Sequence, residues 1–298
     1  MTSDAALAAY EAARARLPDA PSPVAAPERV ASLADLAPRF DAFFLDAFGV
    51  LNVGEDAIPG APERIAALQD AGKRVLVVSN AAGFPHDRLM EKYARLGFKF
   101  APEDVVTSRK ALAVAVGDGA GRRWGLMVSD GVDAAEFDAL DHRRLRDDPE
   151  DYDTVDAVLM IGSATWTEER QSLLEAALLE RPRPVLVGNP DIVAPRAEGF
   201  SVEPGSYAHR LADRTGVAPE FYGKPFANIF DLAFARVPDV PRERIVMVGD
   251  SLHTDILGAR VAGIAAALVT DHGFPSGRDL DLDTDATGIR PDYVMGSP

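Results

Sequence analysis

Four stretches of this 298-residue chain carry polar side chains at places where a protein can act on a substrate. Each lies at the end of an apolar run or in the loop leading to one: Asp46; Ser79 with Asn80; Lys224; and Asp250 with Asp255. Ligands bind at the carboxyl ends of strands in parallel α/β sheets, so Asp46, with a turn at Gly49 just after it, is placed to act on a substrate. Each stretch alone fits an ordinary turn or solvated loop as well, so the prediction depends on all four occurring together.

The apolar runs alternate with segments of helical pattern. We expect strands at residues 43–46, 74–78, 104–106, 244–248 and 265–270, and helices at residues 59–72, 85–96, 228–236 and 255–262. Alternating strands and helices are typical of a parallel sheet with right-handed crossovers. The fold class predicted for this part is therefore α/β, with a Rossmann-like parallel-sheet core.

The middle of the chain reads as a second, inserted α/β domain. A glycine-rich break at residues 117–121 precedes a new series of strands at 124–128, 157–161 and 185–187, with a helix at 167–180. The expected organisation is a helix and linker at residues 1–39, a core at 40–118 and 213–298, and the inserted domain at 119–212.

The composition of the chain limits the classes of partner that the protein can bind. The formal net charge of −16 opposes non-specific binding to nucleic acids and to anionic membranes. No run of the sequence approaches the length of a transmembrane span, and the first thirty residues do not look like a signal peptide. The chain has no cysteine, which excludes disulfides and thiolate chemistry. We therefore expect a cytoplasmic protein that binds neither nucleic acid nor membrane.

Taken together, the four stretches resemble the motifs of the haloacid dehalogenase-like (HAD) superfamily. The matching residues are Asp46-Ala47-Phe48-Gly49-Val50-Leu51, Ser79-Asn80, Gly223-Lys224-Pro225 and Gly249-Asp250-Ser251-Leu252-His253-Thr254-Asp255. The resemblance covers nearly all of residues 40–295. The large insertion between Ser79 and Lys224 looks like the C2 cap of the NagD-like, or sugar-phosphatase-like, branch. Two further stretches look like that branch: Ile58-Pro59-Gly60-Ala61 and Gly188-Asn189-Pro190-Asp191.

The resemblance implies a Mg²⁺-dependent phosphatase for a small phosphorylated metabolite, such as a sugar phosphate. Asp46 would be the nucleophile that forms an aspartyl-phosphate, and Lys224 would offset the charge of the crowded carboxylates. By the same resemblance, Asp46, the Phe48 backbone carbonyl and Asp250 would bind Mg²⁺, and Asp255 would bind it through water or position Lys224. Ser79 and the Asn80 backbone would donate hydrogen bonds to the phosphate. Asn189 and Asp191 of the cap would contact the substrate. We interpret His253 as a loop residue. Asn189 and Asp191 fit an Asx-type turn equally well. Relatives with such caps form homodimers through the cap, so a homodimer is expected here too.

The chain departs from the family pattern at Phe48. Phosphatases of the family carry there an aspartate that protonates the leaving group and then activates water, a role worth about 10²–10⁴-fold in rate. Three interpretations stay open: a phosphohydrolase that is slow or acts on good leaving groups, a weak or inactive protein that binds a phosphorylated ligand, and a dehalogenase-type enzyme that attacks carbon. The carboxylates of Asp250 and Asp255 argue against the last, because a metal-free displacement at carbon has little use for them. A residue from the cap could also replace the missing acid.

Overall fold

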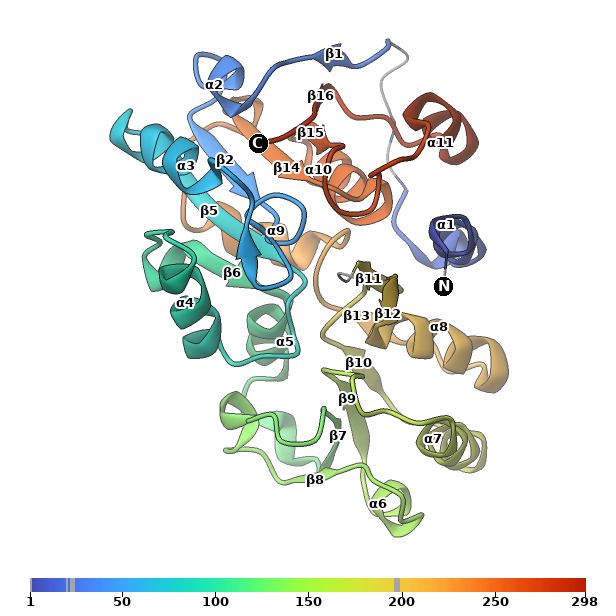
Figure 1. The fold of residues 1–298 in the computed structure, drawn as a ribbon. Coiled ribbons are helices and arrows are strands. Elements are labelled where there is room, and N and C mark those ends of the chain that lie inside the picture. Colours follow the sequence, from blue (N-terminus) through green and yellow to red (C-terminus); the bar gives the residue numbers. More distant parts are fainter. Residues whose placement is uncertain (1, 20, 22–24, 196–198) are drawn as a thin grey trace.

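The computed structural model describes residues 2–19, 21, 25–195 and 199–298, and its larger part is built on one parallel sheet (Figure 1). This core sheet has seven strands in the order β1 (Glu28–Arg29), β16 (Tyr293–Met295), β15 (Ala265–Val269), β14 (Ile245–Gly249), β2 (Ala42–Leu45), β5 (Arg74–Ser79) and β6 (Val105–Thr107). From β2 the chain runs outward to β5 and β6, and it later returns to β14 on the other side of β2. The strand order therefore reverses between β2 and β14, which is where doubly wound sheets bind ligands.

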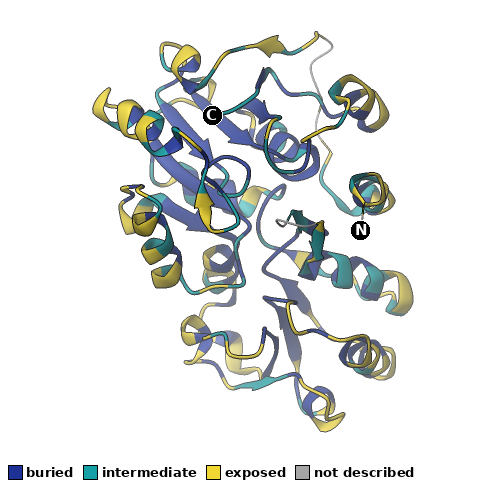
Figure 2. Cartoon of the chain, viewed as in Figure 1, coloured by how far each residue is buried: buried dark blue, intermediate teal, exposed yellow. Residues whose placement is uncertain are grey.

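Both faces of the core sheet are buried, as the apolar runs predict (Figure 2). Phe43 and Leu45 belong to the apolar cluster on one face, whereas Ala42 and Phe44 belong to the cluster on the other. The helices of the core are α2 (Leu33–Leu36), α3 (Ala61–Asp70), α4 (His86–Arg95), α5 (Ser108–Val116), α9 (Ala227–Phe234), α10 (Leu257–Ala262) and α11 (Leu280–Thr287). A fully buried strand such as β2 holds its terminal residues rigidly, which suits a site built at its end.

A second parallel sheet forms the inserted domain, which we call the cap. Its five strands follow the order β13 (Glu220–Phe221), β10 (Val185–Val187), β9 (Ala157–Met160), β7 (Trp124–Met127) and β8 (His142–Arg144). Its helices are α6 (Glu150–Asp153), α7 (Glu168–Glu180) and α8 (Pro204–Thr215), and two hairpins complete the fold: β3 (Asn52–Val53) with β4 (Asp56–Ala57), and β11 (Val193–Pro195) with β12 (Phe200–Val202). The predicted α/β class, with a parallel core and an inserted α/β domain, is confirmed.

We propose that the chain returns from cap to core later than residue 212. Helix α8 contacts α7, and β13 pairs in parallel with β10 of the cap sheet, after residue 212 where we ended the insertion. A two-residue strand leaves no apolar run in the sequence, because it is defined only by its partner. We therefore propose that the cap extends to Phe221.

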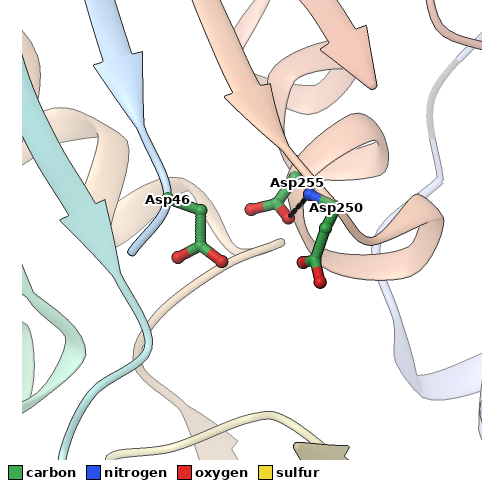
Figure 3. A group of neighbouring side chains, drawn as sticks. All are labelled: Asp46, Asp250 and Asp255. Atoms are coloured by element: carbon green, nitrogen blue, oxygen red, sulfur yellow. Dashed lines mark hydrogen bonds between the residues drawn. The ribbon is translucent and has the colours of Figure 1, made fainter. Parts of the chain in front are cut away.

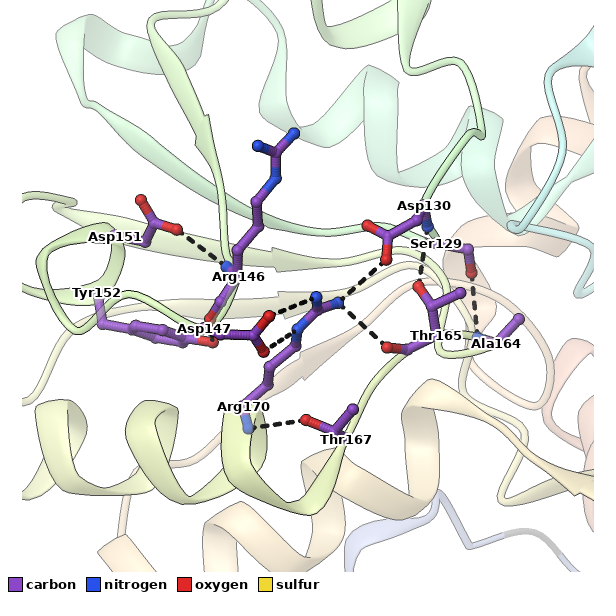
Figure 4. A network of polar contacts seen from close by, with 10 residues as sticks. All are labelled: Ser129, Asp130, Arg146, Asp147, Asp151, Tyr152, Ala164, Thr165, Thr167 and Arg170. Carbon is purple, nitrogen blue, oxygen red and sulfur yellow. Dashed lines mark hydrogen bonds and ion pairs between the residues drawn. The ribbon is translucent and has the colours of Figure 1, made fainter.

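A polar network braces the acidic segment of the cap (Figure 4). The guanidinium of Arg170 donates to both carboxylate oxygens of Asp147, at 2.8 and 3.1 Å, and to the Thr165 carbonyl oxygen at 3.1 Å. The Thr167 hydroxyl accepts from the Arg170 backbone N–H and so caps helix α7. These hydrogen bonds fix the segment between β8 and β9 against α7 and so stabilise the cap.

The N-terminal part of the chain contributes one helix and one strand to the folded structure. Helix α1 (Ser3–Ala12) lies between α11 and α8 in Figure 1, and β1 pairs in parallel with β16 at the edge of the core sheet. Among the described residues, no helix has the length and apolar character that a membrane crossing requires.

Candidate active site

The predicted strand-end residues come together at the point where the strand order reverses. Asp46 directly follows β2, Asp250 directly follows the neighbouring strand β14, and Ser79 is the last residue of β5. Asp255 lies on a single π-helical turn, residues 252–256, and its carboxylate accepts the backbone N–H groups of Asp250 and Ser251 at 3.1 Å each. The three carboxylates of Asp46, Asp250 and Asp255 thus converge on one small volume (Figure 3).

Lys224 reaches this group from the loop after the cap. Its Nζ donates to Asp46 Oδ1 and to Asp255 Oδ1, at 2.7 Å in each case, and the residue is 1% exposed. Burial alone lowers the pKa of the Lys224 ammonium, but the charges of Asp255 and Asp46 outweigh it and raise that pKa overall. Lys224 therefore stays charged and joins the two carboxylates as their counter-ion.

The remaining negative charge at the site is only partly offset. Burial, followed by the charges of Asp46 and Asp255, raises the pKa of Asp250, and burial raises that of Asp255 to about 6. One carboxylate oxygen from each of Asp46, Asp250 and Asp255 lies within 4.8 Å of the others. Several carboxylate oxygens around one small volume are what a hard divalent cation such as Mg²⁺ prefers, so these residues fit that ion.

Gly49, in the turn after β2, lets the carboxylates of Asp46 and Asp250 lie close together. Gly49 has a φ of +75°, and a Cβ atom at this position would lie 2.7 Å from Oδ2 of Asp250. A side chain on residue 49 would push the carboxylate of Asp250 away from that of Asp46 and would strain the backbone.

Asn80, directly after β5, forms hydrogen bonds with both the Lys224 loop and the cap. Its side-chain oxygen accepts from the Lys224 backbone N–H at 2.7 Å, and its amide nitrogen donates to the Lys224 carbonyl at 2.9 Å and to Asp191 Oδ1 at 2.7 Å. The side chain of Asn80 therefore links strand β5, the Lys224 loop and the cap. Asn189 forms the Asx-type turn, because its side-chain oxygen accepts from the Asp191 backbone N–H at 3.0 Å.

A cavity of about 560 Å³ opens above these residues, between core and cap. Its lining includes the predicted site residues Asp46, Phe48, Ser79, Asn80, Asn189, Asp191, Lys224 and Asp250. It also includes Tyr10, Arg88 and Phe274, which the sequence analysis missed. Phe274 would have been hard to find, although its backbone N–H donates to Asp250 Oδ2 at 2.9 Å, because no sequence spacing signals that contact. The volume is that of an ordinary small-molecule site.

Asp191 offers a pH-dependent test of the packing between cap and core. Burial raises the pKa of this carboxyl to about 8, well above the roughly 3.9 of an unfolded chain. The folded protein then keeps a proton that the unfolded chain releases, so the stability that Asp191 contributes is lost progressively as pH rises from about 4 to about 8. We expect Asp191→Asn to gain stability relative to wild type by on the order of 1 kcal/mol per pH unit between about pH 5 and pH 8.

Urea unfolding of the metal-free protein at several pH values measures this difference. The exposed Asp138→Asn is the matched control and should show no trend. A difference between Asp191→Asn and wild type that stays constant across the range would mean that the carboxyl is already ionised in the folded protein.

Comparison with known proteins agrees with this fold. Residues 43–141 match the family model of haloacid dehalogenase-like hydrolases, and residues 221–297 match a second model described as HAD-hydrolase-like. The chain therefore belongs to the HAD-like hydrolases, in the NagD-like branch that the motifs indicate.

Curated relatives and solved structures have related names. The acid sugar phosphatase of Staphylococcus haemolyticus is 27% identical, over 76% of this chain and 83% of that protein. The D-glycerol 3-phosphate phosphatase of Mycobacterium tuberculosis is 32% identical, over 78% of this chain and 64% of that protein. A structure of the glycerol phosphate phosphatase of Mycobacterium tuberculosis in complex with magnesium has a TM-score of 0.69 at 28% identity, covering 87% of this chain and 75% of that one. A protein described as a putative nagD protein has a TM-score of 0.65 at 27% identity, covering 78% of this chain and 88% of that one.

Proposed function

We propose that this protein is a Mg²⁺-dependent phosphatase that hydrolyses a small phosphorylated metabolite through an aspartyl-phosphate on Asp46. The observation that carries the proposal is the convergence of Asp46, Asp250 and Asp255 within 4.8 Å, with Lys224 bound to Asp46 and Asp255 on the floor of a cavity. Relatives named as phosphatases of sugars and of glycerol 3-phosphate support the substrate class.

The residues of the chain divide the reaction between them. An Asp46 oxygen attacks phosphorus, and the ester oxygen leaves with the bonding electrons. Water then attacks the phosphorus of the aspartyl-phosphate, which releases phosphate and restores the carboxylate. The Ser79 hydroxyl and the Asn80 backbone N–H donate to the phosphoryl oxygens, and Lys224 holds Asp46 in place. Asp46, Asp250 and the Phe48 carbonyl would hold Mg²⁺, with Asp255 next to them, and the ion would offset the charge of the phosphoryl group.

Phe48 decides which leaving groups are released fast. Its half-buried side chain lines the cavity and carries no proton to donate. An alkoxide that leaves without an acid must take its proton from water, which is slow, whereas acyl phosphates and anhydrides leave as stable anions. We therefore expect acyl phosphates and anhydrides to be hydrolysed faster than alkyl monoesters.

Phe48→Asp tests the effect of the missing acid. We expect turnover of alkyl monoesters to rise by about 10²–10⁴-fold and that of acyl phosphates to rise less, because both need a base that activates water but only the former need a proton at the leaving oxygen. Phe48→Asn is the matched control, since it has the same shape as the aspartate but no acidic proton. Equal rates for the two variants would show that the missing acid does not limit turnover.

A substrate panel distinguishes the proposed function from its alternatives. Phosphate release is measured from alkyl monoesters, acyl phosphates and anhydrides, with Mg²⁺ and with a chelator. Release that depends on Mg²⁺ supports the proposal. Tight binding of these compounds without release would favour a binding protein, and chloride release from a haloacid without metal would favour the dehalogenase alternative. A homodimer formed through the cap and a cytoplasmic location stay predictions.

A further inference from the structure

Helix α1 lies outside the family matches, which begin at residue 43, yet it lies between α11 of the core and α8 of the cap (Figure 1). On the core side its carboxylate Glu11 Oε1 lies 2.6 Å from Nε2 of His253. The ring of Tyr10 stacks on the His253 ring, with centroids 4.8 Å apart. His253 belongs to the turn that carries Asp255, so the helix packs directly on the acidic part of the site.

On the cap side the same helix holds the segment that carries Asp191. The Tyr10 hydroxyl accepts the backbone N–H of Ile192 at 3.2 Å. Ile192, Val193 and Phe274 form one apolar cluster with residues Ala6, Tyr10 and Ala13 of the N-terminal segment. Arg16, just beyond the helix, forms an ion pair with Asp213 of α8. Both domains therefore contact α1, and the contacts meet at Tyr10.

Tyr10 is also a wall of the cavity. It is 3% exposed and lines the same space as Asp46, Asp191 and Asp250. Its ring packs edge-on against Phe274, with centroids 6.3 Å apart. Burial, followed by the charge of Asp191, raises the pKa of the phenol, so its hydroxyl is neutral.

We propose that Tyr10 is a specificity-determining residue, whose ring limits the size of the group attached to the phosphate and whose hydroxyl ties the cap to the core at Ile192. The substrate part of this inference rests on the proposed function, because it takes the cavity above Asp46 to be the phosphate site. A wall supplied by a segment outside the family matches means that this chain selects its substrates differently from relatives that lack the helix.

Two variants separate the ring from the hydroxyl. Tyr10→Ala removes both, whereas Tyr10→Phe keeps the ring and loses only the acceptor for the Ile192 N–H. The probes are methylphosphonate and phenylphosphonate, which cannot be hydrolysed, titrated by calorimetry with Mg²⁺ present. We expect Tyr10→Ala to shift the ratio of the two affinities toward phenylphosphonate by about tenfold, because the lost ring leaves room for the phenyl group. Tyr10→Phe should leave this ratio unchanged.

Hydrogen exchange of the Ile192 amide tests the tie without any ligand. We expect it to become about fivefold faster in Tyr10→Phe, as the loss of one buried hydrogen bond predicts. Ala8→Gln, on the exposed face of α1, is the control and should change neither measurement.

The affinity ratio tests the size limit, and the Ile192 exchange rate tests the contact between the Tyr10 hydroxyl and the cap. An affinity ratio in Tyr10→Ala equal to that of wild type would overturn the size limit, and an unchanged Ile192 exchange rate in Tyr10→Phe would overturn the tie. Failure of wild type to bind either phosphonate would overturn the substrate role together with the phosphate site. A wild type that binds both phosphonates and shows the shift, but releases phosphate from no ester, would overturn the proposed hydrolysis and leave the role of Tyr10 standing.

Discussion

Asp46→Asn is expected to abolish phosphate release, with a loss of about 10⁴-fold or more in kcat. The amide keeps the shape of the side chain and can still accept from Lys224 Nζ, so the fold should persist. It is too weak a nucleophile to form the covalent intermediate, and it removes one negative charge from the proposed metal site. Initial rates with saturating Mg²⁺ and an acyl phosphate measure the effect.

The control for this variant is Asp70→Asn, the same change at an exposed position at the end of α3. It should retain the rate of wild type. Circular dichroism and the urea midpoint show whether Asp46→Asn is folded. A folded Asp46→Asn that turns over within tenfold of wild type would show that Asp46 is not the nucleophile.

Lys224→Met is expected to cost both activity and stability. Lys224 is 1% exposed and donates to Asp46 and Asp255, so the change leaves two carboxylates in a protein interior without their counter-ion. Breaking a buried ion pair from one side costs about 3–5 kcal/mol of unfolding free energy. Methionine has a similar length and fills the space, so the loss reports the charge more than a cavity. Urea unfolding without metal measures it.

The matched control is Lys110→Met on the exposed face of α5, which should alter the unfolding free energy by less than about 0.5 kcal/mol. A loss in Lys224→Met as small as that of the control would contradict the role of Lys224 as the counter-ion of the site. A stable Lys224→Met that also keeps its phosphatase rate would remove Lys224 from the reaction.

The core of the site could be anticipated from sequence because its residues follow long apolar strands. The runs ending at Asp46, Ser79 and Asp250 are buried on both faces, and such strands leave a clear signal. Parallel neighbours end at the same edge of a sheet, so residues far apart in the chain can meet there. The structure brings Asp46 and Asp250 together in this way, whereas Asp255 joins them from the π-helical turn and Lys224 from the loop after the cap.

The parts that could not be anticipated depend on contacts between distant segments. The helical propensity near the N-terminus predicts α1, but nothing in it indicates that Tyr10 would meet His253 and Ile192. His253 was read as a loop residue, and its partner Glu11 lies 242 positions away. The strands β1 and β13 are two residues long, and each is defined only by the strand beside it.

The cap residues illustrate the same limit. The turn at Asn189 was one of two interpretations, and the structure has it. The bond from Asn80 to Asp191 joins β5 to the cap across 111 positions, and only the folded chain reveals it. A contact between Asp191 and the substrate stays a prediction.

The most direct test of the central claim is a search for the covalent intermediate. Wild-type protein is mixed with Mg²⁺ and an acyl phosphate, quenched with acid at successive times, digested, and examined by mass spectrometry. Because Phe48 leaves the site without the usual base to activate water, we expect the aspartyl-phosphate to accumulate on Asp46 and then decay as phosphate appears. Phosphate release without any phosphoryl group on Asp46, or with the group on another residue, would contradict the account.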